Sequence, residues 1–223
     1  LMIIAPATAN IIGKIASGIA DDLLSTTVMA TKAPILICPA MNTNMYENTI
    51  VRSNIGKLSA LGYHFIDAEK GELACRTEGS GRLPPLEGIL EKSISILTKS
   101  DLEGEVILVT AGPTREPIDP VRYITNYSSG KMGYAIAKVA RRRGARVILV
   151  SGPTKLPIPE GVKFISVSSA MEMKESVTKH FEESSIIIKA AAVADYRPLH
   201  YSESKIKKRE GHISISLEKN PDI

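Results

Sequence analysis

The sequence has little or none of several features that mark particular classes of protein. It contains no tryptophan and only 4% aromatic residues, which disfavours a base-stacking surface for single-stranded RNA or DNA. No apolar run approaches the roughly 18 residues of a membrane-spanning helix. Two cysteines, Cys38 and Cys75, are too few for a disulfide framework and indicate free thiols in a reducing compartment. We therefore expect a cytoplasmic protein that binds neither nucleic acid nor a membrane.

Common nucleotide and metal fingerprints are also incomplete. Gly130–Lys131 resembles the end of a P-loop, but Met132 replaces the required Ser or Thr and Thr125 replaces the first glycine. Gly79–Gly81 begins a dinucleotide fingerprint, but Pro84 occupies the third glycine position. No C-x-x-C or H-E-x-x-H motif is present, so the protein alone offers no metal-ligand set. These departures disfavour a Walker ATPase, a plain Rossmann dehydrogenase and a structural zinc site.

What is present is the composition and pattern of an α/β protein. Hydrophobic residues make up 43% and charged residues 23%, and 28 Lys+Arg against 24 Asp+Glu give a net charge of +4. Short β-branched runs alternate with helical patterns, which predicts parallel sheets of the Rossmann or flavodoxin type. The predicted strands are 1–5, 34–38, 63–66, 105–110, 146–150, 162–167 and 185–189. The predicted helices are 9–19, 43–61, 86–98, 130–143 and 170–182.

The order of these elements predicts two domains. A short polar segment, 98–104, separates two βα series, so we place one domain over 1–100 and a second over 101–223. The chain starts inside an apolar run and stops just after a turn, so we expect the first domain to be truncated at its N-terminus and the second at its C-terminus. The charged segment 204–211 and the alternating segment 212–217 favour an exposed ribbon or flap.

The predicted helix 130–143 shows a clear apolar periodicity. Its apolar residues recur at i, i+3, i+4, i+7 and i+8, which predicts that one helical face is buried. The residues expected on that face are Met132, Ala135, Ile136, Val139 and Ala140.

Three segments of the first half carry candidate site residues. Small and polar residues at positions 7–10 follow the first predicted strand, where a flat ligand can approach the backbone or where the chain simply turns tightly. Asn42 stands between a strand and a helix, a position equally suited to a carboxylate ligand and to a helix N-cap. Cys75 lies in a glycine-rich segment near Arg76 and Arg82, which predicts either a lowered thiol pKa or an unreactive loop cysteine.

Together, these segments resemble the flavin-dependent cysteine decarboxylases. Residues 7–10 match the flavin-contacting loop of that family, residues 39–45 match its P-x-M-N-x-x-M block, and the Cys75 segment matches its substrate-recognition clamp, whereas Tyr46 stands where the family has Trp. The resemblance implies that FMN oxidises a cysteinyl thiol, that Asn42 and Met45 bind the substrate, and that Cys75 donates a proton. The FMN contacts that it implies are Ala7, Thr8, Ala9 and Asn10.

The second half contains a long segment between a predicted strand and a predicted helix. Residues 111–129 fill this gap, and a connection of that length is typically functional. Ser128, Ser129 and Gly130 lie at the start of the helix, where backbone N–H groups attract anions. Arg122 and neighbouring cations add positive charge. The segment therefore predicts phosphate binding, with a solvated loop and a capping serine as the alternative.

A second group of candidate residues follows the strand predicted at 185–189. Asp195 lies at the carboxyl end of that strand, where it is suited to a ribose hydroxyl or a metal-bound nucleotide, or simply to capping the next segment. Lys205, Lys207 and Lys208 lie on the predicted flap. They are suited to a triphosphate, although for Lys207 and Lys208 an ordinary solvated face is the favoured interpretation.

Residues 105–223 closely resemble the phosphopantothenate–cysteine ligases. The resemblance rests on the blocks TAGPTREPIDPVR, NYSSGKMG, AAVADY and KIKK with KNPDI. It implies that CTP and Mg²⁺ activate 4'-phosphopantothenate, with Asn126 handling the acyl-cytidylate, Arg122 the pantothenate side and Lys205 the first transfer. Ser128, Ser129 and Gly130 would contact the substrate. The residues implied for CTP are Lys189, Ala190, Ala191, Asp195, Lys205, Asn220, Pro221, Asp222 and Ile223.

The two halves together resemble the bifunctional decarboxylase/ligases of coenzyme A biosynthesis. That family implies a homo-oligomer with dimeric ligase domains and trimeric decarboxylase domains, acting on 4'-phosphopantothenate, cysteine and CTP. The alternatives are a stand-alone flavoprotein cysteine decarboxylase, an NAD-dependent dehydrogenase and a non-catalytic assembly module. The second α/β series counts against the first alternative, and the missing glycine fingerprint counts against the second.

Overall fold

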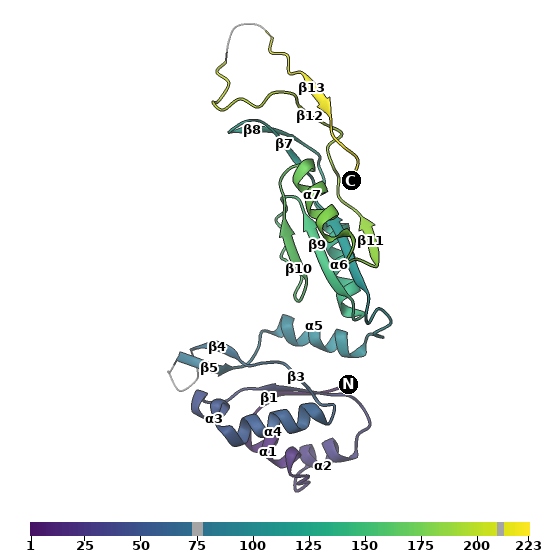
Figure 1. Ribbon diagram of the computed structural model, residues 1–223. Coiled ribbons are helices and arrows are strands. Elements are labelled where there is room, and N and C mark those ends of the chain that lie inside the picture. The colour runs from purple at the N-terminus through teal and green to yellow at the C-terminus, as the bar shows by residue number, and fades with distance from the viewer. Residues whose placement is uncertain (73–77, 209–211) are drawn as a thin grey trace. The chain divides into compact units, whose positions relative to one another are not determined.

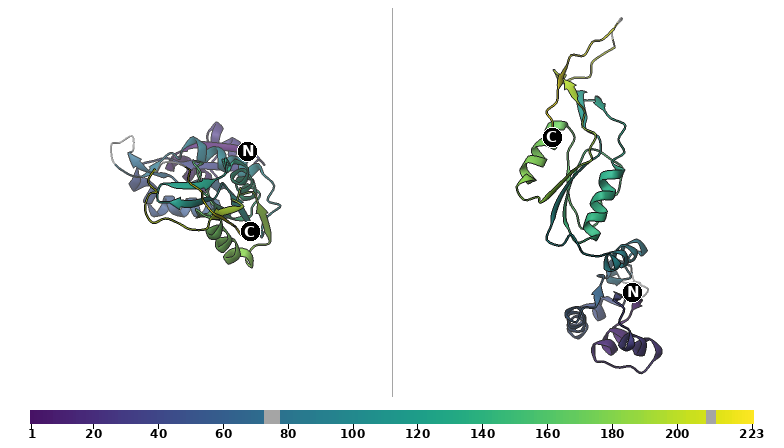
Figure 2. Two further views of the ribbon diagram at one scale, coloured as in Figure 1. Left: turned by 90° about the horizontal axis from the view of Figure 1, so that it is seen from above. Right: turned by 90° about the vertical axis from the view of Figure 1, so that its right-hand side faces the viewer.

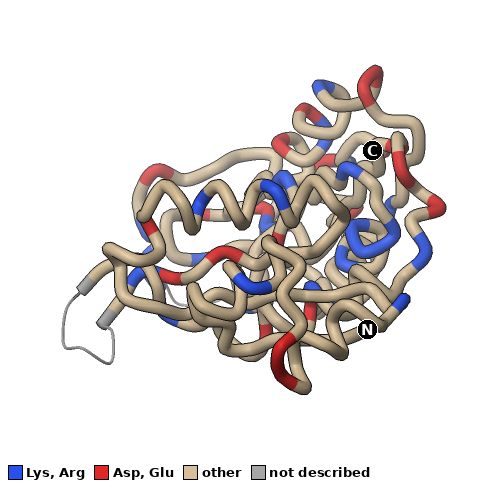
Figure 3. The backbone as a smooth tube through the Cα atoms, turned by 90° about the horizontal axis from the view of Figure 1, so that it is seen from below, with Lys and Arg blue, Asp and Glu red and all other residues tan. Residues whose placement is uncertain are grey.

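The computed structural model describes residues 1–72, 78–208 and 212–223. The chain forms two compact units, Leu1–Thr98 and Lys99–Ile223. Figure 1 shows their helices and strands, and Figure 3 shows that basic and acidic residues are interspersed along the chain. Within the described residues, no helix is both long and apolar enough to cross a membrane. Cys75 and Arg76 lie outside the described residues.

The first unit is built on a three-stranded parallel sheet. Its strands lie in the order β1 (Met2–Ala7), β2 (Ile35–Pro39) and β3 (His64–Phe65), so their carboxyl ends meet at one edge. The accompanying helices are α1 (Ala9–Ala16), α2 (Leu23–Ala30), α3 (Thr43–Glu47), α4 (Thr49–Ala60) and α5 (Leu86–Leu97). The strands predicted at 1–5, 34–38 and 63–66 are confirmed.

Apolar side chains of the central strand β2 alternate between two cores. Ile35 and Ile37 pack in a cluster with residues of α1, α2 and α4, whereas Leu36 and Cys38 pack in a second cluster with Ile89 of α5. All five residues of β2 are buried. Helices therefore cover both faces of this sheet, as the continuous apolar run of the strand predicts.

Two features of the first unit differ from the prediction. The helix predicted over 43–61 is divided into α3 and α4, because Asn48 is extended and its side chain accepts a hydrogen bond from the Ile50 N–H, capping α4. Helix α2 was not predicted. It begins with a capping box in which the Asp22 side chain accepts from the Ser25 N–H and the Ser25 hydroxyl accepts from the Asp22 N–H.

The second unit contains a four-stranded parallel sheet. Its order is β10 (Lys163–Ser166), β9 (Arg146–Ser151), β6 (Val106–Ala111) and β11 (Ile186–Lys189). The four predicted strands of this region are confirmed. Helices α6 (Lys131–Arg142) and α7 (Ala170–Phe181) lie on opposite sides of the sheet, as the right-hand view of Figure 2 shows.

Alternate residues of the central strands separate the two cores of this unit. Ile107 and Val109 of β6 point to the same cluster as Tyr134 and Ala137 of α6. Leu108, between them, joins the cluster on the α7 side. That second cluster contains Ile148, Val150, Met173 and Val177. The period of two along a strand thus determines which helix each residue contacts.

The buried face of α6 differs from the predicted one. Met132 is 65% exposed, Val139 is 47% exposed, and Ala135 is exposed as well. Ala140 is buried as predicted, and Ile136 is partly buried against the core on the α6 side. The buried residues are Gly133, Tyr134, Ala137 and Ala140. A Cβ on Gly133 would lie 2.5 Å from the Cβ of Ala111, so the helix approaches the sheet too closely for larger side chains at this point.

The structure also contains three antiparallel strand pairs that the sequence did not predict at these positions. The long segment after β6 contains a hairpin of β7 (Arg115–Asp119) and β8 (Arg122–Thr125). Residues 212–217 are exposed throughout, as expected for a flap. The antiparallel ribbon of this region is formed by β12 (Tyr196–Pro198) and β13 (Leu217–Lys219). In the first unit, β4 (Glu69–Glu72) pairs with β5 (Glu78–Arg82). The sheets of the chain are therefore parallel in the cores and antiparallel in these ribbons.

Candidate functional site

The carboxyl ends of β6 and β11 form the centre of the site in the second unit. These strands are parallel neighbours, with Lys189 paired to Thr110 at their ends. The hydroxyl of Thr110, which is buried, accepts hydrogen bonds from the N–H groups of Ala190 and Ala191 at 3.2 and 3.3 Å. This strand-end threonine holds the chain after β11 close to β6, where open α/β sheets bind ligands.

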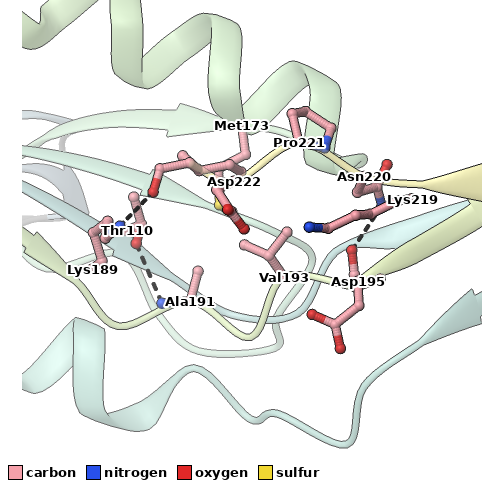
Figure 4. A pocket seen from close by; sticks show the side chains of 12 residues that line it. Thr110, Met173, Lys189, Ala191, Val193, Asp195, Lys219, Asn220, Pro221 and Asp222 are labelled. Atoms are coloured by element: carbon pink, nitrogen blue, oxygen red, sulfur yellow. Dashed lines mark hydrogen bonds between the residues drawn. The ribbon is translucent and has the colours of Figure 1, made fainter.

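A pocket of about 250 Å³ lies at this edge of the sheet (Figure 4). Its wall combines small apolar residues with two lysines and two aspartates, so it offers both cationic and anionic groups to a ligand. The lining residues are Thr110, Met173, Lys189, Ala191, Val193, Ala194, Asp195, Lys219, Asn220, Pro221, Asp222 and Ile223.

Asn220 is fixed by hydrogen bonds at one side of the pocket. It is 4% exposed, its Nδ2 donates to the Ala194 carbonyl at 2.7 Å, and its backbone N–H donates to the Asp195 carbonyl at 2.7 Å. Its Oδ1 accepts from the Arg197 guanidinium at 3.0 Å. At the other side, the Lys189 ammonium donates to the Ile223 carbonyl at 2.6 Å. The segment after β13 is therefore fixed against the segment after β11 by side-chain hydrogen bonds at both ends.

The pocket brings together most of the residues implied for CTP. Lys189, Ala191 and Asp195 line it, as does the whole segment Asn220–Ile223. Ala190 is not among the lining residues. Lys205 is also not part of the wall. The prediction did not include Thr110, Met173, Val193, Ala194 and Lys219.

The missed residues differ in the signal that the sequence carries for them. Val193, Ala194 and Lys219 adjoin predicted residues, and Thr110 is the last polar residue of a predicted strand, so extending each predicted segment would have found them. Met173 comes from α7 and is fully buried. Its pattern is that of an ordinary helix core residue, so no sequence signal distinguishes it.

The N-terminus of α6 lies beside a crowded glycine cluster. Gly130 is the N-cap with φ +75°, and its N–H donates to the Ser128 hydroxyl at 3.3 Å. A Cβ on Gly130 would lie 2.8 Å from the Cγ2 of Thr154, and one on Gly112 would lie 2.9 Å from the same atom. Side chains larger than glycine would therefore move the helix start away from the strand end.

Asn126 precedes this turn and points back to the chain after β11. Its Nδ2 donates to the Ala192 carbonyl at 3.0 Å, while the Thr114 N–H donates to the same carbonyl at 3.3 Å. The structure thus links Asn126 to the segment that contains Ala191 and Asp195. The loop that contains Asn126 is therefore hydrogen-bonded to the segment after β11.

Arg122 belongs to a different group of contacts. Its guanidinium forms an ion pair with Asp119, whose side chain is fully buried, and donates to the Ile206 carbonyl at 2.7 Å. Hydrogen bonding to Arg122, and then to backbone N–H groups, holds the pKa of Asp119 well below its usual range. Lys205 is exposed next to Ile206, so the structure places it beside the β7–β8 hairpin rather than in the pocket wall.

In the first unit, the predicted flavin segment follows β1. Ala7 is fully buried at the strand end and accepts a hydrogen bond from the Ala40 N–H at 2.9 Å. Thr8 is the N-cap of α1 but its side chain makes no capping hydrogen bond, and Thr8 and Asn10 are exposed. Small residues and an uncommitted hydroxyl at this edge fit a flat polar ligand.

Asn42 is confirmed as a helix N-cap, the alternative that its position allowed. Its Oδ1 accepts from the Asn44 N–H at 2.9 Å, and Met45 of α3 is 47% exposed. The β4–β5 hairpin packs here, because the Met41 N–H donates to the Gly81 carbonyl at 2.9 Å. The hairpin that carries Cys75 between its strands therefore contacts the Asn42 segment, although Cys75 itself lies outside the described residues.

Metal-binding groups are sparse in the described part of the chain. It contains no cluster of three or more His, Cys, Asp or Glu side chains able to hold a metal ion. Cys38 is buried in the sheet, and this burial raises the pKa of its thiol. It has the character of a core residue rather than of a nucleophile.

Comparison with known proteins agrees with this division of the chain. Residues 102–223 match the family model described as DNA/pantothenate metabolism flavoprotein C-terminal domain, and residues 1–98 match the model described as Flavoprotein. A crystal structure of the C-terminal domain of a coenzyme A biosynthesis bifunctional protein CoaBC is 53% identical over 54% of this chain and 56% of that chain, with a TM-score of 0.47.

Curated relatives match the whole chain. It is 50% identical over 227 residues to the coenzyme A biosynthesis bifunctional protein CoaBC of Bacillus subtilis, covering 100% of this chain and 56% of that protein. The Escherichia coli protein of the same name is 45% identical over 227 residues with the same coverage. The chain thus spans about half the length of the curated relatives that it matches, and it belongs to the DNA/pantothenate metabolism flavoprotein family through the C-terminal domain at residues 102–223.

Proposed function

We propose that the protein takes part in two steps of coenzyme A biosynthesis. The second unit contributes to the CTP-dependent ligation of 4'-phosphopantothenate with cysteine, and the first to the FMN-dependent decarboxylation of the product to 4'-phosphopantetheine. The resemblance over 105–223 and the 50% identity to a CoaBC protein support this function over a stand-alone decarboxylase or a dehydrogenase. The observation that carries it is the pocket at the carboxyl ends of β6 and β11.

The pocket has the chemistry that a nucleotide needs. Asp195 is a carboxylate acceptor suited to ribose hydroxyls, and Lys189 and Lys219 supply positive charge for phosphate groups. The small Ala191 leaves the backbone accessible to a base. Asp195 and Asp222 are the carboxylates of this wall, which fits a Mg²⁺ ion held by one or two carboxylates together with nucleotide phosphates.

The ligation proceeds in two displacements. The carboxylate of 4'-phosphopantothenate attacks the α-phosphorus of CTP and displaces pyrophosphate, and the amine of cysteine then displaces CMP from the acyl-cytidylate to form the amide. Asn126 orients the acyl-cytidylate, Arg122 binds the pantothenate side, and Lys205 stabilises charge in the first transfer. Ser128, Ser129 and Gly130 bind the anionic substrate at the start of α6.

FMN would lie at the segment after β1, against Thr8, Ala9 and Asn10, with the buried Ala7 forming the strand end behind them. When bound, FMN would supply the two-electron oxidation of the cysteinyl thiol that precedes loss of carbon dioxide and, once reduced, the two-electron return that gives the product thiol. Asn42 binds the substrate carboxylate beside Met45, and its capping bond to Asn44 fixes the side chain at the strand end. Cys75 donates a proton to the product carbon. The contact between Gly81 and Met41 supports this role, since it brings the hairpin to the substrate segment.

Asn126→Asp tests the ligase assignment. An aspartate cannot donate the hydrogen bond that Nδ2 makes to the Ala192 carbonyl, so it cannot orient the acyl-cytidylate in the same way. We expect the full-length variant to bind CTP with an affinity within about threefold of wild type while amide formation falls by at least about 100-fold. Calorimetric titration with CTP and Mg²⁺, and chromatography of the amide, measure the two quantities.

Asn48→Asp is the matched control. Asn48 caps α4 in the first unit, and aspartate caps a helix equally well, so ligation should be unchanged. Normal amide yield in the Asn126→Asp protein would remove the proposed role of Asn126. Failure of the wild-type protein to bind CTP, with no electron density in the pocket after a soak with CTP and Mg²⁺, would overturn the ligase function itself.

Flavin absorbance tests the other unit. We expect the wild-type protein to carry a yellow chromophore and Ala9→Leu to lose most of it, because the added branched side chain would occupy the edge where the flavin approaches.

As part of the same proposal, ligase units form dimers and decarboxylase units form trimers. Light scattering measures the assembly, and a monomer at all concentrations would contradict it.

A further inference from the structure

The β7–β8 hairpin ends in a carboxylate with an unusual number of hydrogen-bond donors around it. Oδ1 of Asp119 accepts from the N–H groups of Val121 and Arg122 at 2.9 and 2.8 Å, which closes the turn. Oδ2 accepts from Nε and Nη2 of Arg122 and from the Ile206 N–H at 3.1 Å. Oδ1 is therefore engaged only within the hairpin, whereas Oδ2 bonds both to Arg122 of the hairpin and to a residue 87 positions further along the chain.

Arg122 completes a two-point attachment of Ile206. While Asp119 accepts from the Ile206 N–H, Nη2 of Arg122 donates to the Ile206 carbonyl at 2.7 Å. Both polar backbone groups of a single residue are thus held by one ion pair. The side chain of Asp119 is fully buried and that of Arg122 is 45% exposed, so the carboxylate is shielded and the guanidinium reaches solvent.

Ile206 lies in the middle of a basic segment, Ser204–Lys208, which we name the lysine strap. Lys205, Lys207 and Lys208 are exposed, whereas Ile206 is partly buried. The approach to the strap is also attached to the hairpin, because the Ser202 N–H donates to the Ile118 carbonyl at 3.0 Å. The exposed lysine side chains of the strap do not hold it in place. The hydrogen bonds to the Ile206 backbone therefore determine the position of the neighbouring Lys205 backbone.

We propose that Asp119 is a positioning residue: with Arg122 it anchors the lysine strap at Ile206 and thereby places Lys205 for the nucleotidyl transfer. The simpler interpretation is that Asp119 only closes the β7–β8 turn. Turn closure accounts for the bonds to Oδ1 and for the pairing of Oδ2 with Arg122, which all lie within the hairpin. It does not account for the two bonds that leave the hairpin, from the Ile206 N–H to Oδ2 and from Nη2 of Arg122 to the Ile206 carbonyl. A charged pair at this place suits the task, since hydrogen bonds between ionised groups are stronger than neutral ones.

Asp119→Asn separates the two roles. The Asn Oδ1 can still accept the two turn N–H groups, but its Nδ2 would face the Ile206 N–H and the Arg122 guanidinium, which are all donors. We expect the Ile206 amide to exchange with D₂O at least about tenfold faster, and trypsin to cleave after Lys205 and Lys207 at least about tenfold faster. Residue-resolved hydrogen exchange by NMR and timed proteolysis of the whole chain measure these rates.

Asp101→Asn is the matched control within the same unit. Asp101 also pairs with an arginine through two hydrogen bonds, to Arg143 at 2.7 and 2.9 Å, but its side chain is exposed and it lies in the segment before β6 rather than beside the strap. Its loss should leave both rates within about twofold of wild type. Arg122→Gln is the second variant and decides the matter if Asp119→Asn fails to fold by circular dichroism. Unchanged rates in the folded variant, or an equal rise in Asp101→Asn, would overturn the anchor.

The kinetic consequence rests on the proposed ligase function. In the full-length protein, Asp119→Asn should lower kcat for pyrophosphate release at least about tenfold and leave CTP affinity within about threefold, because the strap lysine is misplaced while the pocket is intact. An unchanged kcat in a variant with a released strap would overturn the positioning role. Absence of CTP binding by wild type would count against the proposed function instead, while the exchange rates would still decide the anchor.

Discussion

At the scale of single residues, glycine allows a helix of the second unit to pack closely on its sheet. Gly133 lies on the buried face of α6, where a Cβ would come within 2.5 Å of Ala111 Cβ and 3.0 Å of the Thr110 carbonyl. Thr110 is also the residue that holds the chain after β11. A change at Gly133 therefore acts on the strand end that forms the pocket.

Gly133→Ala should destabilise the second unit by about 1–3 kcal/mol, because the added methyl group forces α6 away from β6. Gly56→Ala is the control, since Gly56 lies within α4 and has open space at its Cβ position. There alanine should stabilise the first unit by about 0.5–1 kcal/mol through its helix propensity. Urea unfolding followed by circular dichroism measures both changes, and equal effects at the two sites would contradict this account of the packing.

The close approach at Gly133 also explains why apolar spacing did not predict the buried face of α6 correctly. Counting apolar residues at helical spacing selected Met132 and Val139, yet they are 65% and 47% exposed. Hydrophobicity indicates which side chains gain from burial but not how near two elements approach, and near approach favours Gly and Ala. Asp195, by contrast, was singled out because it follows a predicted strand, and Asn220 was included through the resemblance to the ligases; both line the pocket.

At the scale of elements, the β4–β5 hairpin is held to the segment before α3 by a backbone contact. Gly81→Ala should release it, because Gly81 has φ +141° and a Cβ would lie 2.0 Å from the Met41 carbonyl oxygen. We expect faster hydrogen exchange at the Met41 amide, which donates to the Gly81 carbonyl.

Gly62→Ala provides the comparison for conformational strain alone. Gly62 has φ +89° with open space around it, so alanine there costs about 1–2 kcal/mol without a clash. Exchange at the Met41 amide should be unaffected in that variant. If the two substitutions accelerate it equally, the contact between Gly81 and Met41 does not hold the hairpin.

A charged network ties three elements of the second unit together through Glu183, just beyond α7. Glu183 pairs with Arg146 of β9 at 2.7 Å, with His180 of α7, and with Lys163 of β10 at 3.9 Å. Hydrogen bonding to Arg146 and then to His180 lowers the pKa of Glu183 to about 2. The charged form is therefore favoured in the folded protein.

This shift gives a pH dependence with a defined sign. Because the folded-state pKa is lowered, the stabilisation is fully present above the ordinary carboxylate pKa of about 4.3 and is lost as pH falls toward 2. Glu183→Gln should be less stable than wild type at pH 7, and the difference should shrink over that acid range. Glu175→Gln on α7 is the control, and a pH-independent difference for Glu183→Gln would contradict the prediction.

The sequence predicted long periodic elements better than short ones. The seven predicted strands are confirmed. The central strands β2, β6 and β9 are continuous apolar runs buried between helices, whereas β3 has only two, half-buried residues. The β7–β8 hairpin was missed, since its strands contain Pro117 and charged residues rather than an apolar run, and its pairing depends on the turn at Asp119. Helix α2 had a readable signal, the capping box at Asp22, but a weak apolar pattern.

At the scale of the whole molecule, each unit has cores of its own on both faces of its sheet. We expect two resolved transitions in calorimetry of the whole chain. We also expect residues 99–223, expressed alone, to unfold at the temperature of one of those transitions, because the cores of this unit use its own strands and helices. A single transition together with an unfolded 99–223 fragment would contradict this independence.

The two-sheet organisation of the molecule was easier to predict from the sequence than the pocket was. Alternation of strands and helices predicts parallel sheets directly, since each unit needs only local pattern and right-handed connections. The pocket required four separate segments to converge, at Thr110, Met173, 189–195 and 219–223, and its first and last lining residues are 113 positions apart. Such convergence depends on sheet order and ribbon pairing, which no local pattern specifies.

The methyl group of Met173 can serve as an NMR probe of ligand binding in the pocket. The chain has seven methionines, and this one is fully buried against the pocket wall, while Met132 is 65% exposed on the other helix of the same unit. In a sample with ¹³C-labelled methionine methyl groups, the Met173 resonance would report from inside the wall whether a small molecule has arrived, with the Met132 signal as an internal reference. A screen of candidate compounds would then need no turnover and no foreign dye.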